Sequence, residues 1–519
     1  MTDSVLPGRL KGAMWADADR RVAVAGFGLA CAIGLVFAFV GLDTHSLWFD
    51  ELFTAKLLEP WPATTLFGRI ATDVHPPVYL LTLGAFIQLL GDSEAGLRLP
   101  SALAACGAIV VFVLGTRAVF SLPARLFGAA LATGSLYWFN QAQNARSYAL
   151  CLLIVAGILV LSLALLRQHR GPRLPALLAL MLVGSFVHFY VLYVSLAVLI
   201  LLIVFERRDG VVLAAAAFGL VLAAGLYVKL VIEPHTRVSL VDNWYRNDAA
   251  WYLAVLKSCV QYTLGTPGLA ALLLCAIAFL HGRRGSTSFP RDRVTLFLTG
   301  APVLVLLGAI VSSTLLAPNF WDRNFLVVSP FLWALCARAY DVAVEKAAPA
   351  VRLALAGTLA VLLLSMASIA TARLPGAEAR VLHEPFRQSA AWIRSLPACR
   401  GETLPVVTTD SPSWYKPGYA ELIYDSAYGY YLRGFATTEL VFMRDLALGA
   451  LPAGLKAELQ RRLAGGGCPV IAWTAHNMTP EAVAWIQARL LMALGAEAAK
   501  VVAQEFEDGS LGYVLYHPR

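Results

Sequence analysis

Polar side chains, most of them ionisable, stand out in this otherwise apolar sequence because their types could act on a hydroxyl or a phosphate group. They lie in polar loops or interrupt apolar runs: Asp50, Glu51, Asp73, His75, Arg98, Gln143, Arg146, Tyr148, His188, Tyr190, Arg246 and Arg323. A carboxylate can accept the proton of a hydroxyl group, and an arginine can bind a phosphate through two parallel hydrogen bonds. Such chemistry requires the fold to bring these residues to one place.

Asp50 and Glu51 are adjacent in the sequence. On a helix their side chains would point about 100° apart, so they cannot both address one atom. We expect one carboxylate to face a reacting centre and the other to hold the loop or a ligand. Asp50 could equally cap a helix that begins at Glu51, and the two roles are compatible.

The string Asp73-Val-His75-Pro-Pro precedes a short apolar segment, Pro77 to Leu90. The two prolines restrict His75 to extended geometry, which would hold Asp73 and His75 at the entrance of a helix lying along the membrane surface. A simple helix start is the alternative interpretation. We predict no metal site, because no second His or Cys lies at a ligand spacing.

Two arginines occupy short loops between apolar runs, Arg146 in Asn140 to Tyr148 and Arg323 in Pro318 to Asn324. Each could extend to lipid headgroups or bind a lipid phosphate. His188 interrupts another apolar run, either as a satisfied helix end or as a functional group at membrane depth.

The elements that must position these residues are membrane-spanning helices. The chain has 519 residues, of which 59% are hydrophobic and 14% charged. Near-uncharged runs of about 17 to 25 residues match the length that a bilayer demands. We predict a polytopic α-helical membrane protein with about 11 spans: Val22–Leu42, Leu99–Thr116, Ala124–Phe139, Ala149–Leu166, Leu174–Val187, Tyr190–Phe205, Val211–Ile232, Gly268–His281, Val294–Leu316, Phe325–Ala337 and Leu353–Thr371. The first is expected to be a retained anchor.

Basic residues give the orientation. With the N-terminus inside, the inner loops carry 18 Lys and Arg residues and the longer outer loops carry 8. This bias predicts a cytoplasmic N-terminus, and an odd number of spans places the C-terminus outside. The net charge of +8 is therefore a topology signal, and nucleic acid is not an expected partner. The polar residues named above all fall on the outer side, many of them in the loop Asp43 to Arg98.

From residue 373 to residue 519 the composition changes to that of a small α/β domain outside the membrane. We expect strands at Pro405–Thr409, Leu440–Met443, Pro469–Thr474, Val501–Phe506 and Gly512–Tyr516, and helices at Glu384–Ser395, Gly454–Leu463 and Pro480–Met492. Cys399 and Cys468 lie in this domain and could form a disulfide if it faces an oxidising compartment.

Residues 1–372 resemble the polytopic GT-C glycosyltransferases, in particular the bacterial branch with the aminoarabinose and galacturonic acid transferases of lipid A and core and the protein O-mannosyltransferases. Five strings carry the resemblance in order: Trp48-Phe-Asp-Glu51, Asp73-Val-His-Pro-Pro-Val-Tyr79, Arg98-Leu-Pro-Ser101, Gln143-Asn-Ala-Arg-Ser-Tyr148 and Arg323-Asn-Phe-Leu-Val-Val-Ser-Pro330. The chain departs from the family where Asn324 replaces the usual tyrosine.

The resemblance implies an inverting transfer from a polyprenyl-phosphate sugar, on the periplasmic face of the bacterial inner membrane, to a hydroxyl of lipid A or core, another glycolipid, a polysaccharide or a protein. No cofactor is expected. A phosphate leaving group needs cations and an acceptor hydroxyl needs a base. We therefore expect Asp50 to be the base, with Asp50 and the arginines on opposite sides of a cavity. The remaining candidates would bind substrate: Glu51, Asp73, His75, Arg98, Arg146, Tyr148, His188 and Arg323.

Two other classes stay open. A lipid or sugar transporter would also need many spans and polar groups at membrane depth, although the sequence has no internal repeat. In an extracytoplasmic sensor or scaffold the C-terminal domain would carry the function.

Overall fold

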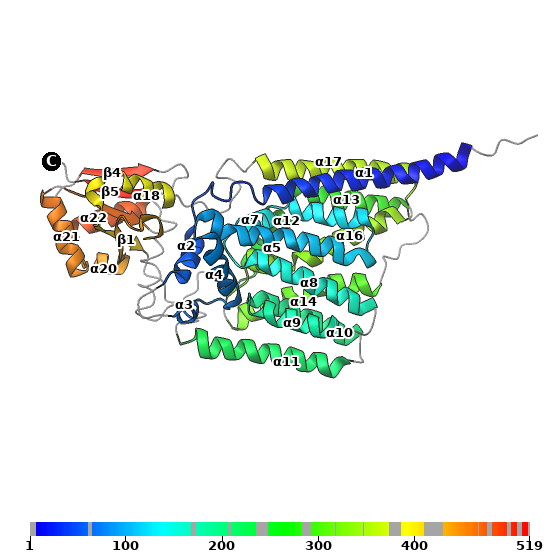
Figure 1. The fold of residues 1–519 in the computed structure, drawn as a ribbon, viewed down its shortest axis with the longest axis horizontal. Helices are drawn as coiled ribbons and strands as arrows, with labels where there is room; N and C mark the ends of the chain where they lie inside the picture. The colour runs from blue at the N-terminus through cyan, green and yellow to red at the C-terminus, as the bar shows by residue number, and fades with distance from the viewer. Residues whose placement is uncertain are drawn as a thin grey trace, which may run out of the picture.

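The computed structural model describes residues 7–60, 65–167, 173–205, 209–234, 248–282, 292–316, 318–345, 347–372, 386–408, 429–465, 467–474, 480–495, 500–505 and 511–516. Its larger part is a bundle of long apolar helices, and its smaller part is an α/β domain at one end of that bundle (Figure 1).

Each of the 11 predicted spans contains helix, although Ala124–Phe139 is divided between two helices and Val22–Leu42 extends beyond the end of its helix. The bundle consists of α1 (Pro7–Phe37), α5 (Glu94–Gly115), α6 (Leu122–Thr133), α7 (Leu136–Ala142), α8 (Tyr148–Arg167), α9 (Arg173–Ser185), α10 (Phe189–Phe205), α11 (Gly210–Tyr227), α12 (Ala249–Thr263), α13 (Gly265–Gly282), α14 (Arg293–Leu315), α16 (Ser329–Glu345) and α17 (Pro349–Ala372). Within the described residues, seven helices are long and apolar enough to cross a membrane, or eight if α12 and α13, bent by 80°, form one span. The helix α12 was not predicted; it lies between the predicted spans Val211–Ile232 and Gly268–His281.

Small residues let the helices pack closely, as membrane helices require in the absence of a hydrophobic drive between them. A Cβ added at Gly26 of α1 would lie 2.4 Å from the Cβ of Ala360 of α17. These two helices run side by side along one edge of the bundle, and α11 lies along the opposite edge (Figure 1). The centre is occupied by α8, whose mean hydropathy of 3.0 suits a helix surrounded by other helices.

Three short helices lie at the end of the bundle beside the α/β domain: α2 (Phe49–Leu58), α3 (Leu66–Ile70) and α4 (Val78–Leu90). The prediction of a short helix after the paired prolines is confirmed by α4. It ends at Gly91, whose φ of +76° favours glycine, and α5 begins with Ser93 accepting a hydrogen bond from the Gly96 N–H. A Cβ on Gly96 would lie 2.5 Å from the Gly91 carbonyl oxygen, so the turn between α4 and α5 needs a small residue there.

The C-terminal part contains the five predicted strands: β1 (Thr403–Thr408), β2 (Thr437–Phe442), β3 (Val470–Thr474), β4 (Lys500–Glu505) and β5 (Leu511–Tyr516). They form one mixed sheet in the order β2-β1-β3-β5-β4, with β5 antiparallel to both of its neighbours. Among the described residues of this part, four α-helices accompany the sheet: α18 (Phe386–Arg394), α20 (Met443–Ala447), α21 (Ala453–Gly465) and α22 (Pro480–Leu494).

Alternation along the strands builds two cores in this domain. Val406 belongs to a core continuous with the bundle, whereas its neighbour Val407 packs with Leu459 and Leu490 of the covering helices. A disulfide joins Cys399 to Cys468, as the sequence allowed.

Candidate active site

Asp50 lies in the first turn of α2, with a side chain 25% exposed. The helix begins at Phe49 and its N-cap residue is Trp48, so the expectation that Asp50 caps a helix starting at Glu51 is wrong. The capping contact is made instead by Glu51, whose carboxylate accepts the Trp48 N–H at 3.3 Å. The Asp50 carboxylate is thereby left to face other partners.

Two arginines from distant segments approach the same oxygen of Asp50. The Asp50 Oδ2 atom lies 3.5 Å from Arg323 Nη1 and 3.9 Å from Arg146 Nη2. Arg146 also donates to Thr54 Oγ1 at 3.0 Å and to the Asp50 carbonyl oxygen at 3.4 Å. Thr54 is one turn further along α2, so a single helix face presents the carboxylate and anchors one of its cationic partners.

We expected Asp50 and the arginines to face each other across a cavity. The structure instead brings both guanidinium groups to the Asp50 carboxylate. The Asp50 carboxylate is therefore an anionic partner shared by the two guanidinium groups.

Arg323 belongs to α15 (Asp322–Phe325), a single helical turn before α16. Its guanidinium carbon lies 5.7 Å from the centre of the Trp48 ring and 6.0 Å from that of Trp321. Its backbone carbonyl accepts the Tyr137 hydroxyl at 3.1 Å. Aromatic rings therefore hold the guanidinium of Arg323 near Asp50.

Glu51 and Arg98 form a buried pair beside the site. Both are almost fully buried, and Arg98 Nε donates to Glu51 Oε1 at 2.9 Å while Arg98 Nη2 contacts Glu51 Oε2. Glu51 Oε1 also accepts the Ala145 N–H at 2.8 Å. The remaining Arg98 donors bond the carbonyls of Leu42, His45 and Ser46. These contacts hold α2 against the bundle, which agrees with the expectation that one of the two adjacent carboxylates holds the loop. The substrate-binding roles of Glu51 and Arg98 stay predictions.

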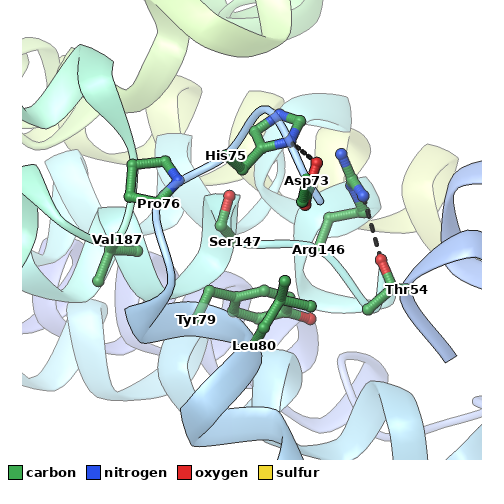
Figure 2. A pocket seen from close by; sticks show the side chains of 9 residues that line it. All are labelled: Thr54, Asp73, His75, Pro76, Tyr79, Leu80, Arg146, Ser147 and Val187. Atoms are coloured by element: carbon green, nitrogen blue, oxygen red, sulfur yellow. Dashed lines mark hydrogen bonds and ion pairs between the residues drawn. The ribbon is translucent and has the colours of Figure 1, made fainter. Parts of the chain in front are cut away.

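Asp73 and His75 line a small pocket beside Arg146, and Figure 2 shows them from nearby. His75 Nδ1 lies 3.0 Å from Asp73 Oδ1. Burial by itself raises the pKa of Asp73, but His75 and then Arg146 outweigh it, so the pKa lies below its usual value. The other lining residues are Thr54, Pro76, Tyr79, Leu80, Ser147 and Val187.

An aromatic cluster lies behind this pocket. The His188 ring is 5.8 Å from the His75 ring and 5.5 Å from the Tyr148 ring, measured between centroids. His188 Nδ1 accepts the Tyr190 N–H at 3.2 Å, which fixes the His188 ring at the start of α10. The Tyr148 hydroxyl donates to Asn324 Oδ1 at 3.2 Å, so the asparagine that replaces the family tyrosine is part of the packing. His188 and Tyr148 are both buried.

Gln143 and Arg246 were also among the polar residues expected on the outer side. Gln143 Nε2 donates to the carbonyls of Phe37 and Val40 and so holds the end of α1. Arg246 lies outside the described residues.

Sequence reasoning missed Thr54 and Trp48. Neither is unusual as a residue type, and Thr54 gains its role only because it lies one turn from Asp50 on α2. Trp48 Nε1 donates to Asn144 Oδ1 at 3.1 Å and so connects α2 to the loop that carries Arg146. The signal available in the sequence was that Trp48 and Asn144 lie in the two strings, Trp48–Glu51 and Gln143–Tyr148, that also carry Asp50 and Arg146.

Within the part of the chain that the structure describes, no three His, Cys, Asp or Glu side chains gather in a way that could hold a metal ion. The arrangement offers a partly exposed carboxylate, two guanidinium groups and a neighbouring polar pocket. Such a set can accept a proton from a hydroxyl group and can bind a phosphate.

Comparison with known proteins gave one family and several solved structures. Residues 74–235 match the family model described as dolichyl-phosphate-mannose-protein mannosyltransferase. A search of curated protein sequences gave no match. The matched segment contains His75, Arg146 and His188 but neither Asp50 nor Arg323.

The fold is similar to that of ArnT from Cupriavidus metallidurans in the apo state, with a TM-score of 0.60 and 15% identity over 95% of this chain and 98% of that chain. The same protein bound to undecaprenyl phosphate gives a TM-score of 0.56 at 15% identity, over 95% and 99% of the two chains. The arabinofuranosyltransferase AftD from Mycobacteria gives 0.51 at 14% identity, over 95% of this chain and 40% of the other. At these identities the similarity establishes a shared fold.

Proposed function

We propose that this membrane glycosyltransferase of GT-C fold takes a sugar from a polyprenyl-phosphate donor and transfers it, with inversion, to a hydroxyl group of a cell-envelope acceptor. The observation that carries the proposal is the Asp50 carboxylate with Arg146 and Arg323 beside it. One carboxylate and two guanidinium groups match the needs of a reaction with a hydroxyl nucleophile and a phosphate leaving group.

In the proposed reaction Asp50 is the catalytic base. The acceptor oxygen bonds to the anomeric carbon of the sugar, and the bond from that carbon to the phosphate oxygen breaks. The electron pair leaves with the polyprenyl phosphate, and Asp50 takes the hydroxyl proton. Arg146 and Arg323 would bind the phosphate and stabilise the charge that develops on it.

The donor class has independent support. The similar ArnT structure was solved with undecaprenyl phosphate, a polyprenyl phosphate. In the present structure both arginines contact Asp50, and an entering phosphate would compete for them. This exchange would free the carboxylate to meet the acceptor hydroxyl.

The pocket beside Arg146 supports a site for the sugar or the acceptor. Asp73 and His75 are the polar groups that could accept and donate hydrogen bonds to a carbohydrate there. Glu51, Arg98, Tyr148 and His188 would act indirectly, because each is buried among protein partners. The acceptor is proposed as a glycolipid such as lipid A or core, a polysaccharide or a protein.

We propose that the site faces the periplasm of a bacterial inner membrane, with residues 1–372 as the membrane module and residues 373–519 as a periplasmic domain. Three observations support this orientation: the excess of basic residues in the opposite loops, the position of α2 to α4 beside the C-terminal domain, and the Cys399–Cys468 disulfide in that domain. Disulfides persist in oxidising compartments such as the periplasm.

The test is Asp50→Asn in cells that lack the native protein. Mass spectrometry of envelope glycolipids and glycoproteins first identifies the mass increment that depends on the protein. Asp50→Asn should abolish that increment at normal membrane levels, since removing a general base costs about 10²- to 10⁴-fold in rate. Undiminished transfer by Asp50→Asn would remove Asp50 from the mechanism. Transport of a lipid-linked sugar into vesicles without covalent transfer would support the transporter interpretation.

A further inference from the structure

The segment that leads into α2 is held from two sides by two arginines. Its five consecutive carbonyls, from Leu42 to Ser46, all accept hydrogen bonds from guanidinium groups. Arg98 of the bundle bonds those of Leu42, His45 and Ser46. Arg387 of α18, in the C-terminal domain, bonds those of Asp43 and Thr44 at 2.7 and 2.6 Å. Two parts of the molecule therefore share one short segment.

Tyr431 of the C-terminal domain continues this arrangement. The Leu47 N–H donates to the Tyr431 hydroxyl oxygen at 2.7 Å, and the Tyr431 hydroxyl donates to Glu94. Arg387 also pairs with Glu94, which lies in the first turn of α5. Burial raises the pKa of Tyr431, so its hydroxyl keeps the proton that it donates to Glu94. Glu94 thereby ties both C-terminal residues to the helix that carries Arg98.

The held segment ends where the site begins. Leu47 is followed by Trp48, the N-cap residue of α2, and Asp50 is the second residue of that helix. With the carbonyls of Leu42 to Ser46 and the Leu47 N–H all engaged, the start of α2 has little freedom to rotate or shift. A shift there would move Asp50 relative to Arg146 and Arg323.

We propose that Arg387 and Tyr431 are positioning residues, through which the C-terminal domain sets the place of the Asp50 carboxylate. The inference rests on the proposed function, because it assumes that Asp50 is the base. It makes the C-terminal domain a working part of the transferase. Displacement of a reacting group by about 1 Å can cost about 100-fold in rate, so a modest loosening of this segment would be felt in turnover.

Other contacts join the same two parts without touching this segment, and they supply a matched control. Arg433 pairs with Asp92 and with Glu59 at 3.1 Å. Arg433→Ala removes contacts between the C-terminal domain and the bundle but leaves residues 42 to 47 held. If the C-terminal domain serves only as an attached module, loss of Arg433 and loss of Tyr431 should have similar effects.

The experiment compares Tyr431→Phe, Arg387→Gln and Arg433→Ala in membranes with matched protein levels. We measure the rate at which the protein-dependent mass increment forms, the affinity for undecaprenyl phosphate, and hydrogen exchange of residues 42–53. Tyr431→Phe and Arg387→Gln should lower the rate about 10- to 100-fold and speed exchange in that segment, with lipid affinity unchanged. Arg433→Ala should behave as the parent protein.

Rates equal to the parent in both Tyr431→Phe and Arg387→Gln would overturn the inference, as would equal losses in those variants and Arg433→Ala. Exchange in the β1 and β2 strands reports whether the domain stays folded. If Tyr431→Phe unfolds the C-terminal domain, Arg387→Lys tests the inference by the same criteria. Lysine keeps the charge but cannot bond the Asp43 and Thr44 carbonyls as the guanidinium does. Asp50→Asn runs in parallel. An active Asp50→Asn variant defeats the proposed function, whereas an inactive one beside fully active Tyr431→Phe and Arg387→Gln variants defeats only this inference.

Discussion

Arg323 Nη1 lies 3.5 Å from Asp50 Oδ2, although 273 positions separate the two residues in the sequence. The contact joins the first outer loop to the turn that precedes α16, and the long helices between them bring the two together. A carboxylate and a guanidinium at this distance attract each other. The fold therefore places the proposed base next to one of the proposed phosphate-binding residues.

The first prediction concerns binding of the donor phosphate. Arg323→Ala should weaken binding of undecaprenyl phosphate by about 10- to 100-fold, because a hydrogen bond to a charged group contributes about 1.5–3 kcal/mol. The affinity of Arg323→Lys should lie between those of the parent protein and Arg323→Ala, since lysine keeps the charge without the paired donors. Titration of the purified protein in nanodiscs measures the affinity.

Arg338→Ala serves as the control for charge removal, because Arg338 pairs with Asp292 away from the site. Equal affinity in Arg323→Ala and the parent protein would exclude Arg323 as a phosphate ligand. Arg146 is a less clean test, since its contact with Thr54 also anchors α2.

The second prediction separates structural from substrate-binding roles in the Glu51–Arg98 pair. Glu51→Ala leaves the Arg98 guanidinium buried beside a lost partner, which should lower the free energy of unfolding by about 3–5 kcal/mol. Lys229→Ala removes one half of an exposed pair with Glu233 and should cost about 1 kcal/mol or less. Thermal unfolding in detergent compares the two. A Glu51→Ala protein as stable as the parent, but weak in substrate binding, would assign Glu51 the substrate-binding role that the sequence predicts.

The fold was largely predictable because hydropathy and alternation are local signals. Each predicted span contains helix, and all five strands of the C-terminal sheet lie where short apolar runs indicated them. The bend between α12 and α13 was not predictable, because α12 carries polar residues such as Lys257 and lacks the apolar length of a span.

The sequence predicted which residues belong to the site but not which of their side chains contact each other. Asp50, Arg146 and Arg323 were chosen because charges are rare in an apolar chain, and the structure brings these three together. Arg98 looked equally suitable, yet its donors are used by Glu51 and backbone carbonyls. Which charges satisfy each other is decided by three-dimensional packing, and the same residue type can bind a ligand or hold a loop.

The third prediction tests the disulfide and the orientation together. Cys399 and Cys468 are 69 residues apart, and loss of a bridge closing such a loop typically costs about 2–5 kcal/mol. Cys399→Ser should lower the unfolding temperature of the protein and abolish the mobility difference between reduced and unreduced gels. The buried Cys151 provides the control, because Cys151→Ser should leave that difference intact. A parent protein whose Cys399 and Cys468 are labelled by a thiol reagent without prior reduction would contradict both the bridge and the oxidising location.

The last prediction concerns Asp73 and pH. Its pKa lies below the ordinary value of 3.8, because His75 and Arg146 outweigh the effect of burial, so the carboxylate is charged throughout the range from about pH 5 to 8. A carboxylate with a depressed pKa stabilises the folded protein above its unfolded pKa, and this stabilisation is lost only as the pH falls through the lower folded value. Asp73 therefore cannot produce a change of rate with pH near neutrality.

Asp73→Asn should raise the KM for the acceptor by about 10- to 100-fold, the cost of a lost charged hydrogen bond, while the shape of the pH–rate profile stays the same. Disappearance of an acid limb in Asp73→Asn would show that this carboxylate titrates during turnover, which would make it a rival to Asp50 as the base.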